Sequence, residues 1–115
     1  MDLYRASGAR VGEANVYAGL ADLERADGNY PEADTLYHQA LDTYTAINMP
    51  FNIALALQRL GHTAKAVENP TQAREYYQQA LDIFTAIGSP TATEVQANLD
   101  NLPPPQAGTV GEALK

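Results

Sequence analysis

Few side chains in this sequence are of the types that perform catalysis or bind metals. The chain has two histidines, His38 and His62, and no cysteine. Neither histidine has a second histidine three or four residues away, which is the spacing of a helical metal site. Ser7 and Ser89 stand in turn-like places without a neighbouring base to activate a hydroxyl. We therefore predict that the protein is not an enzyme and has no catalytic residue, no cofactor and no metal site.

The other polar and aromatic groups do not assemble a site either. No phosphate-binding glycine loop occurs, because GxGxxG and GxxxxGK[ST] are both missing. The carboxylates of Glu32, Asp34 and Asp42 fit the solvated face of a helix. Five aromatic residues could stack on nucleic-acid bases, but their helical spacing favours core positions, with only Tyr76 expected to be partly exposed. These are Tyr37, Tyr44, Tyr76, Tyr77 and Phe84.

The charge balance is acidic, with 14 carboxylates against 7 Lys and Arg residues and a net charge of −7. Phosphate backbones and anionic lipids repel such a chain, so we expect no nucleic-acid partner and no membrane. No apolar run approaches the roughly 20 residues that cross a bilayer. The first residues, MDLYRASGAR, lack the apolar core of a secretory signal. We therefore expect a cytoplasmic protein.

The sequence contains an internal repeat with a period of 40 residues. Residues 11–50 align with residues 51–90 without a gap, and 14 of the 40 aligned positions are identical. The phrase QALDTYTAINMP at 39–50 returns as QALDIFTAIGSP at 79–90, and residues 2–8 carry a faint third copy. Self-similarity at a fixed period of this length is typical of stacked-repeat architectures.

Each unit is predicted to fold as two antiparallel helices, because apolar residues recur at three- and four-residue steps and no strand-like alternation is evident. The stripes comprise Tyr17, Leu20, Ala21, Ala33, Tyr37, Ala40, Leu41 and Tyr44 in the first unit. In the second they comprise Ala54, Leu57, Leu60, Gly61, Ala64, Ala73, Tyr77, Ala80, Leu81, Phe84 and Ile87. Alanines at 33, 40, 73 and 80 are expected to let neighbouring helices approach closely, so that the helix pairs stack.

Helix ends are marked by recognisable residues. Asn69 precedes Pro70 and is expected to cap a helix, since proline is tolerated at the first helical position. Asn29 and Glu32 have the spacing of a capping box. Gly88 is well placed to end a helix.

The spacing of these residues resembles the tetratricopeptide repeat (TPR). The second unit supplies Leu57, Leu60-Gly61, Ala73, Tyr77 and Ala80, and the first supplies Tyr17, Leu20-Ala21, Ala33, Tyr37 and Ala40. Glu24 and Ala64 replace an expected aromatic, and Thr45 and Thr85 replace the closing proline, so the units resemble a longer 40-residue variant. The resemblance implies an all-α fold, an α-solenoid of stacked antiparallel helix pairs forming a superhelix. An ordinary antiparallel bundle that arose by duplication is the alternative.

The expected organisation has five parts. Residues 1–10 end the second helix of a truncated preceding repeat, and 11–50 and 51–90 are TPR-like repeats. Residues 91–102, with Val95, Leu99 and Leu102 at helical spacing, are a capping helix or a degenerate third repeat. Residues 103–115 are a proline-rich linker or tail. The VGEA at 110–113 copies 11–14, so a further helix beginning there is the alternative.

In a TPR array the first helix of each pair lines a concave groove, so the resemblance implies where a partner binds. The groove-facing positions are Asn15, Ala18, Gly19, Asp22, Arg25, Leu55, Gln58, Arg59, His62 and Lys65. We expect an acidic or carboxylate-ended peptide, with Arg59 and Lys65 as counter-charges and Leu55 as an apolar contact. The alternative is that Asp22 neutralises Arg59 or His62 across the stack.

The function expected from these features is that of a non-catalytic module that binds a peptide or protein segment, within a larger scaffold, sensor or regulatory protein. The alternative is an oligomerisation element in which the exposed apolar ends of the array pair with another copy.

Overall fold

The computed structural model describes residues 2–103, with side chains from Gly8 onward. These residues form five α-helices and contain no strand. The helices are α1 (Asp2–Ala26), α2 (Tyr30–Ala46), α3 (Pro50–Ala66), α4 (Pro70–Ala86) and α5 (Thr91–Asp100). The all-α prediction is confirmed, whereas nearly all of the expected tail, 104–115, lies outside the described residues.

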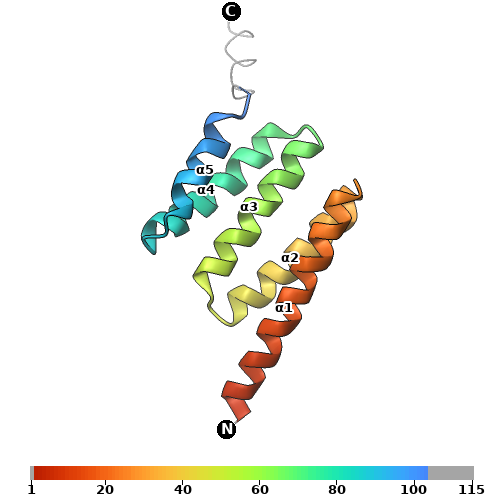
Figure 1. Ribbon diagram of the computed structural model, residues 1–115, viewed down its shortest axis with the longest axis vertical. Coiled ribbons are helices and arrows are strands. Elements are labelled where there is room, and N and C mark those ends of the chain that lie inside the picture. The colour runs from red at the N-terminus through yellow and green to blue at the C-terminus, as the bar shows by residue number, and fades with distance from the viewer. Residues whose placement is uncertain (1, 104–115) are drawn as a thin grey trace, which may run out of the picture.

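The helices are arranged in two layers (Figure 1). The pairs α1–α2 and α3–α4 form antiparallel hairpins, α2 packs on α3, and α5 packs on α4. Side-chain contacts then join alternate helices. Asp22 of α1 reaches Arg59 of α3, and the Tyr76 hydroxyl of α4 lies 3.3 Å from His38 Nε2 of α2. The helices α1, α3 and α5 therefore form one layer, and α2 and α4 form the other.

The four turns between helices share one geometry at intervals of 20 residues. Each contains one residue with a positive φ: Gly28 (84°), Asn48 (57°), Glu68 (62°) and Gly88 (70°). In every turn the next amide reaches back five residues to a carbonyl, as in the bond from Asn69 N to the oxygen of residue 64. This Schellman arrangement satisfies carbonyls that a helix end would otherwise leave without partners. The prediction that Gly88 ends a helix is confirmed.

The predicted caps are confirmed for one helix and wrong for another. Asn69 Oδ1 accepts a hydrogen bond from Gln72 N at 3.2 Å, so it caps α4. Asn29 makes no such bond, and the predicted capping box with Glu32 does not form. The Asn29 amide instead donates to Glu24 Oε1 at 2.7 Å, which ties the start of α2 to the end of α1.

The helix α1 differs from the expected boundary between residues 10 and 11, because it runs without interruption from Asp2 to Ala26. Residues 8–10 align with the turns at 48–50 and 88–90, but Arg10 stands where those turns have Pro50 and Pro90. Without proline, no ring excludes the preceding residue from helical conformation and no amide hydrogen is missing. The helix therefore continues through this position.

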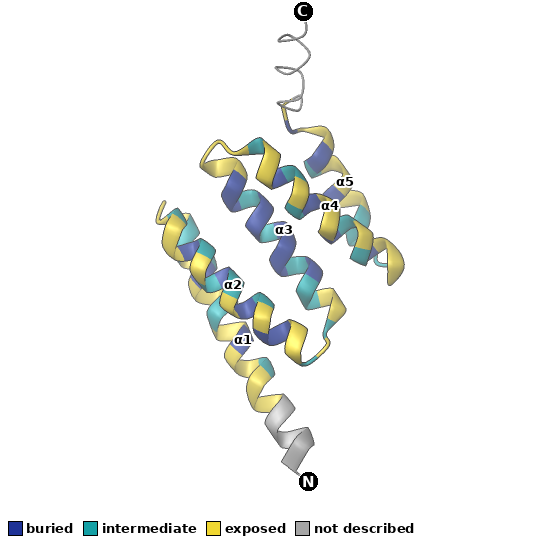
Figure 2. Cartoon of the chain, turned by 180° about the vertical axis from the view of Figure 1, so that it is seen from behind, coloured by how far each residue is buried: buried dark blue, intermediate teal, exposed yellow. Residues whose placement is uncertain are grey.

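The core consists mainly of alanine and aromatic side chains. The four predicted contact alanines, at 33, 40, 73 and 80, are all fully buried, as are Tyr37, Phe84 and Leu60. Figure 2 shows that α3, between α2 and α4, carries the most extensive buried surface, and eight of its residues are buried. Val95, Leu99 and Leu102 complete the core from α5 and the residues after it.

Two predicted core residues, Leu20 and Ile87, are exposed. The predicted apolar stripe includes Leu20, but 45 % of this residue is accessible, whereas its repeat counterpart Leu60 is fully buried. The difference arises because α2 packs on α3, and no described helix covers the corresponding side of α1. Val16 (59 %) and Leu23 (63 %), which lie four and three residues from Leu20 on the same side of α1, are also exposed.

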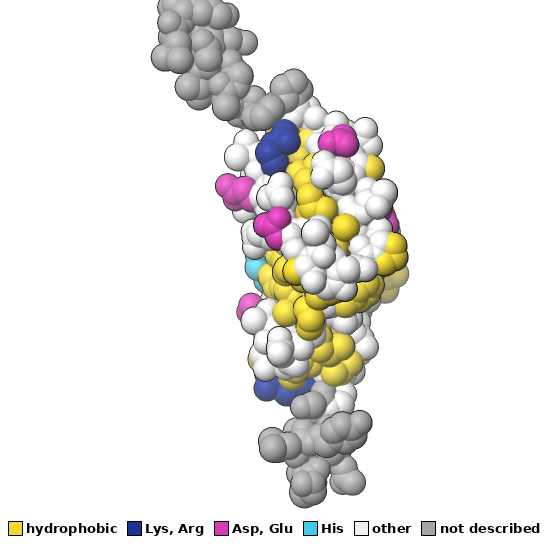
Figure 3. Space-filling view, turned by 90° about the vertical axis from the view of Figure 1, so that its left-hand side faces the viewer, with side chains coloured by type: hydrophobic (Ala, Val, Ile, Leu, Met, Phe, Trp, Pro, Cys, Tyr) yellow, Lys and Arg dark blue, Asp and Glu magenta, His cyan; other side chains and the backbone are white. Residues whose placement is uncertain are grey.

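Apolar side chains are also visible on the side of the molecule that carries the turns preceding α3 and α5 (Figure 3). Phe51 is 43 % exposed, and its ring meets the buried Phe84 ring edge to face at a centroid distance of 5.5 Å. Ile87 is 42 % exposed. Single exposed apolar residues of this kind are common on folded proteins and do not indicate a binding surface.

Substituting Gly61 with alanine tests the close packing between α3 and α4. A Cβ there would lie 2.5 Å from Tyr77 Cε1, and the Tyr77 ring is 1 % exposed. We expect overpacking to cost about 1–3 kcal/mol in the free energy of unfolding, offset by about 1 kcal/mol of helix propensity. Gly19→Ala, where a Cβ meets nothing within 4 Å, is the matched control and should be stabilising. Urea denaturation that finds both variants equally stable would contradict this packing argument.

Candidate functional site

The surface formed by α1, α3 and α5, called here the first-helix face, is held together by side-chain bonds between these helices. Arg59 on α3 forms an ion pair with Asp22 on α1, with 3.3 Å between Nη1 and Oδ2. Gln58 donates from Nε2 to Glu94 Oε2 at 3.0 Å and to Asn98 Oδ1 at 2.9 Å on α5. The face is therefore a continuous surface across three helices.

The predicted binding residues lie on α1 and α3 but differ in accessibility. Asn15, Gly19 and Lys65 are exposed, and Ala18, Asp22, Arg25, Leu55, Arg59 and His62 are half-buried. Gln58 is only 3 % exposed, because α5 covers it. It therefore serves the contact between α3 and α5 and is not available to a partner.

Four predicted binding residues are hydrogen-bond partners of tyrosines that reach across from the second layer: Asn15, Asp22, Arg25 and His62. The Tyr37 hydroxyl donates to Asp22 Oδ1, and the Tyr44 hydroxyl donates to Asn15 Oδ1. Buried tyrosines usually need such a partner, because an unpaired hydroxyl in the core is costly. The polar residues at these positions are therefore explained in part by the fold itself.

The internal repeat shows the same coupling between the two layers. Tyr44 of the first hairpin corresponds to Phe84 of the second, which has no hydroxyl, and Asn15 corresponds to Leu55. Leu55 packs against the apolar cluster that contains Phe84. The polarity of the residue on the first helix thus follows that of the aromatic residue 29 positions later. This paired change at a fixed spacing is a signal in the sequence that Asn15 is a structural partner of Tyr44.

Asp22 is the centre of a charged network between α1 and α3. Its carboxylate contacts Arg59 and the Tyr37 hydroxyl, and Oδ1 also lies 4.0 Å from Arg25 Nη2. Arg25 Nε donates to the Tyr37 oxygen at 3.1 Å. Neutralisation of Arg59 by Asp22, the alternative to a counter-charge for a ligand, is therefore the arrangement in the structure.

The second hairpin places a histidine where the first has Asp22. His62 Nδ1 lies 2.6 Å from the Tyr77 hydroxyl. Burial raises the pKa of Tyr77 to about 12, with Arg25 opposing the shift, so the phenol keeps its proton at neutral pH. Burial and then the nearby Arg25 lower the pKa of His62 below 6.5. A neutral imidazole therefore accepts the hydrogen bond from the Tyr77 hydroxyl.

A hollow opens on the first-helix face between the ends of α1 and α3. It encloses about 540 Å³ and is lined by Arg25, His62, Lys65 and Ala66. Among the described residues, no carboxylate lies within 4.0 Å of the Lys65 ammonium. Arg25 and Lys65 occupy the last turns of their helices, where a cation also offsets the negative end of the helix dipole. The hollow is the part of this face best suited to an anionic group.

The part of the chain that the structure describes contains no group of three or more His, Asp and Glu side chains that could hold a metal ion. In the same residues, no helix combines the length and the apolar character needed to span a bilayer.

Comparison with known proteins identifies one family. The family model described as tetratricopeptide repeat matches residues 12–86, which include both hairpins except the first turns of α1. The comparisons with curated proteins and with solved structures give no match.

The depressed pKa of His62 makes a prediction about the pH dependence of stability. Because the unfolded chain binds a proton at His62 more readily than the folded chain, the free energy of unfolding should decrease as the pH falls below about 6.5. His62→Gln keeps an acceptor for Tyr77 and should show a shallower decrease between about pH 7.5 and about pH 5.5. His38→Gln, which removes the other histidine, is the control. Urea denaturation at each pH measures the slopes, and an equally steep decrease in H62Q would contradict the assignment.

Proposed function

Because the chain belongs to the tetratricopeptide repeat family, we propose that it is a non-catalytic module that binds a segment of a partner protein on its first-helix face. TPR repeats are in general protein–protein interaction modules. Repeats of this architecture present an extended surface across several units. Here the bonds from Asp22 to Arg59 and from Gln58 to α5 make that surface continuous.

The hollow between the ends of α1 and α3 is the observation that carries the proposal. Its lining combines two cations, Arg25 and Lys65, with an imidazole and an alanine, and contains no carboxylate. An acidic or carboxylate-ended peptide matches that chemistry. Arg59, the expected counter-charge, already contacts Asp22 at 3.3 Å, so we assign this role to Lys65. Arg25 adds positive charge beside it, although its own guanidinium lies 4.0 Å from Asp22. Leu55 and Ala18 supply apolar surface along the same face.

Reversing the charge of Lys65 tests this proposal. The probes are an acetylated tetrapeptide of Asp and Glu with a free carboxyl terminus and its Asn/Gln analogue, titrated at low salt. We expect Lys65→Glu to weaken binding of the acidic peptide about tenfold or more, equivalent to about 1.4 kcal/mol. Arg10 lies at an exposed position near the start of α1, and Arg10→Glu changes the net charge by the same amount as Lys65→Glu. This control should leave the affinity for the acidic peptide within about twofold of the parent protein. Equal affinity of K65E and the parent protein would refute the acidic-peptide site.

Self-association is a second candidate, and the exposed stripe on α1 favours it. Val16, Leu20 and Leu23 are 59, 45 and 63 % exposed, whereas their counterparts on α3 are no more than 3 % exposed. The outer side of α5 is polar, with Thr93, Gln96 and Asp100 exposed. The apolar surface therefore favours pairing of α1 with α1 of a second copy over head-to-tail stacking.

Sedimentation at several concentrations distinguishes the two functions. If α1 pairs with a second copy, the protein should dimerise reversibly, and Leu23→Glu should shift it to monomer by burying a charge in the contact. Thr93→Glu on the outer side of α5 is the control and should leave the equilibrium unchanged. A parent protein that stays monomeric at every concentration would contradict self-association without affecting the peptide-binding proposal.

A further inference from the structure

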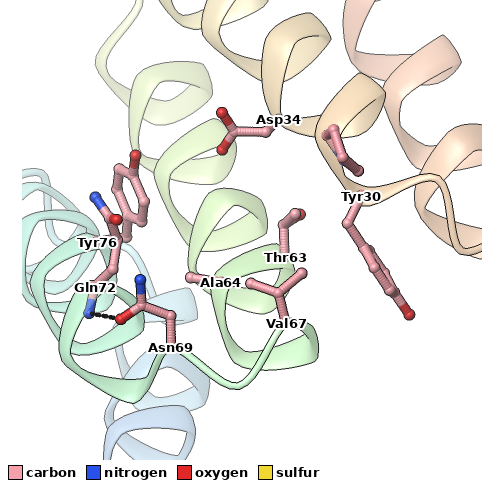
Figure 4. Close-up of a pocket in the computed structure, with 9 residues that line it drawn as sticks. Tyr30, Asp34, Thr63, Ala64, Val67, Asn69, Gln72 and Tyr76 are labelled. Atoms are coloured by element: carbon pink, nitrogen blue, oxygen red, sulfur yellow. Dashed lines mark hydrogen bonds between the residues drawn. The ribbon is translucent and has the colours of Figure 1, made fainter.

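A second depression lies at the opposite layer, between the first turns of α2 and α4 and above the end of α3 (Figure 4). It encloses about 250 Å³, below the roughly 300 Å³ at which pockets for whole small molecules begin. This volume fits one long side chain. Asp34 and Tyr76 line it from α2 and α4, and Ala64 and Val67 line it from α3 and the residue after it.

The chemical character of this cleft is anionic at one end and apolar along its floor. Asp34 is its only charged lining residue, and no Lys or Arg lines it. Figure 4 shows the Asp34 carboxylate and the Tyr76 hydroxyl on the same side of the cleft, with Ala64 and Val67 between α2 and α4. Val67 is 51 % exposed, so its apolar surface is open to a ligand.

The hydrogen bonds around Asp34 leave its carboxylate able to accept more. His38 Nδ1 lies 2.9 Å from the Asp34 backbone oxygen and 3.3 Å from its Oδ2, while Nε2 faces the Tyr76 hydroxyl at 3.3 Å. Because the backbone oxygen can only accept, His38 donates to it from Nδ1, and the Tyr76 hydroxyl lies at the other ring nitrogen. Burial, followed by Asp34 and Glu75, raises the pKa of Tyr76, so the phenol keeps the proton that it donates. Apart from the His38 ring, no basic side chain among the described residues lies within 4.0 Å of the Asp34 carboxylate.

The internal repeat shows that the fold does not require a carboxylate at this position. Asp34 corresponds to Arg74, and Thr63 corresponds to Pro103. In the second unit Arg74 Nη2 donates to the Pro103 carbonyl at 2.7 Å, so the chain itself provides an acceptor for a guanidinium there, although Arg74 Nε is buried without a partner. In the first unit, Asp34 carries the opposite charge to Arg74. Thr63, which occupies the position of Pro103, donates its hydroxyl to the Arg59 backbone oxygen and not to Asp34.

We propose that this cleft binds an arginine side chain of a partner polypeptide, with the guanidinium on Asp34 and Tyr76 and the methylene stem on Ala64 and Val67. Arginine fits better than lysine because its planar fork pairs with a carboxylate through two parallel bonds and stacks on an aromatic ring. Its stem covers apolar surface while the charged head stays near water. The net charge of −7 favours the approach of a cationic segment. This site is separate from the first-helix face and takes a ligand of the opposite charge.

Nuclear magnetic resonance titration of the full chain tests the site. The probe is N-acetyl-arginine-amide, and the matched probe is N-acetyl-citrulline-amide, which has the same shape without the charge. We expect saturable shifts of the amide signals of Asp34, Ala64, Val67 and Tyr76 with the arginine probe. Binding of the citrulline probe should be weaker by about tenfold or more, because the ion pair to Asp34 is lost.

Two substitutions on α2 separate a specific site from general attraction to an acidic protein. Asp34→Asn should abolish the saturable shifts while preserving the spectrum of the folded chain. Asp42→Asn removes the same charge from an exposed position of the same helix and should leave them unchanged. Saturable binding that survives in D34N, equal binding of citrulline, or shifts spread over the acidic surface without saturation would each overturn the proposal. Because the K65E experiment uses an anionic probe on the other layer, the failure of one proposal leaves the other standing.

Discussion

The structure depends on close contact between helices at alanine. Seven alanines on α1 to α4 are fully buried: Ala14, Ala21, Ala33, Ala40, Ala54, Ala73 and Ala80. Six of them occupy equivalent positions in the two hairpins, and the seventh, Ala21, corresponds to the buried Gly61. An alanine side chain has no rotamer freedom to lose on burial and lets two backbones approach closely. The bulk of the core then comes from the tyrosines and phenylalanine of the second layer, which fill the space beside these contacts. Enlarging any one of the small residues would separate helices that several other contacts hold together.

This close approach also couples the two layers chemically. The aromatic side chains of α2 and α4 are long enough to cross the hairpin, so their hydroxyls reach residues of the first-helix face at Asp22, Asn15 and His62. The presence or absence of a hydroxyl on a buried aromatic residue is therefore matched by the polarity of its partner on the first-helix face. The exchange of Tyr44 and Asn15 for Phe84 and Leu55 shows this coupling within one chain.

The helices, their hairpin pairing and most of the core follow from the sequence, because apolar spacing and a gap-free repeat are local and repeated signals. The exceptions depend on neighbours that periodicity does not describe. Leu20 and Leu60 occupy the same repeat position, yet only Leu60 has a helix packed over it. Asn29 and Asn69 are also equivalent, but Glu24 competes for the Asn29 side chain.

For the candidate site, sequence reasoning identified the helices that form the face but not the state of each residue on it. Arg59 and Gln58 are engaged by Asp22 and by α5, and such contacts require the packing of three helices. The cleft beside Asp34 was not predicted, because its lining comes from residues 30–34 and 63–76, which only the packing of the two hairpins brings together. Its only charged lining residue also belongs to an ordinary solvated helix face.

The shared geometry of the four turns has a consequence for how the chain can change in length. Since positive-φ residues stand at 28, 48, 68 and 88, the smallest unit that preserves the architecture is one helix with its turn, half of the 40-residue repeat. One residue inserted into a helix would rotate everything beyond it by about 100°, exposing alanines and burying carboxylates. We expect natural or designed length variation to occur in whole periods, and most readily in steps of 40 residues, since these also preserve the order of the two layers.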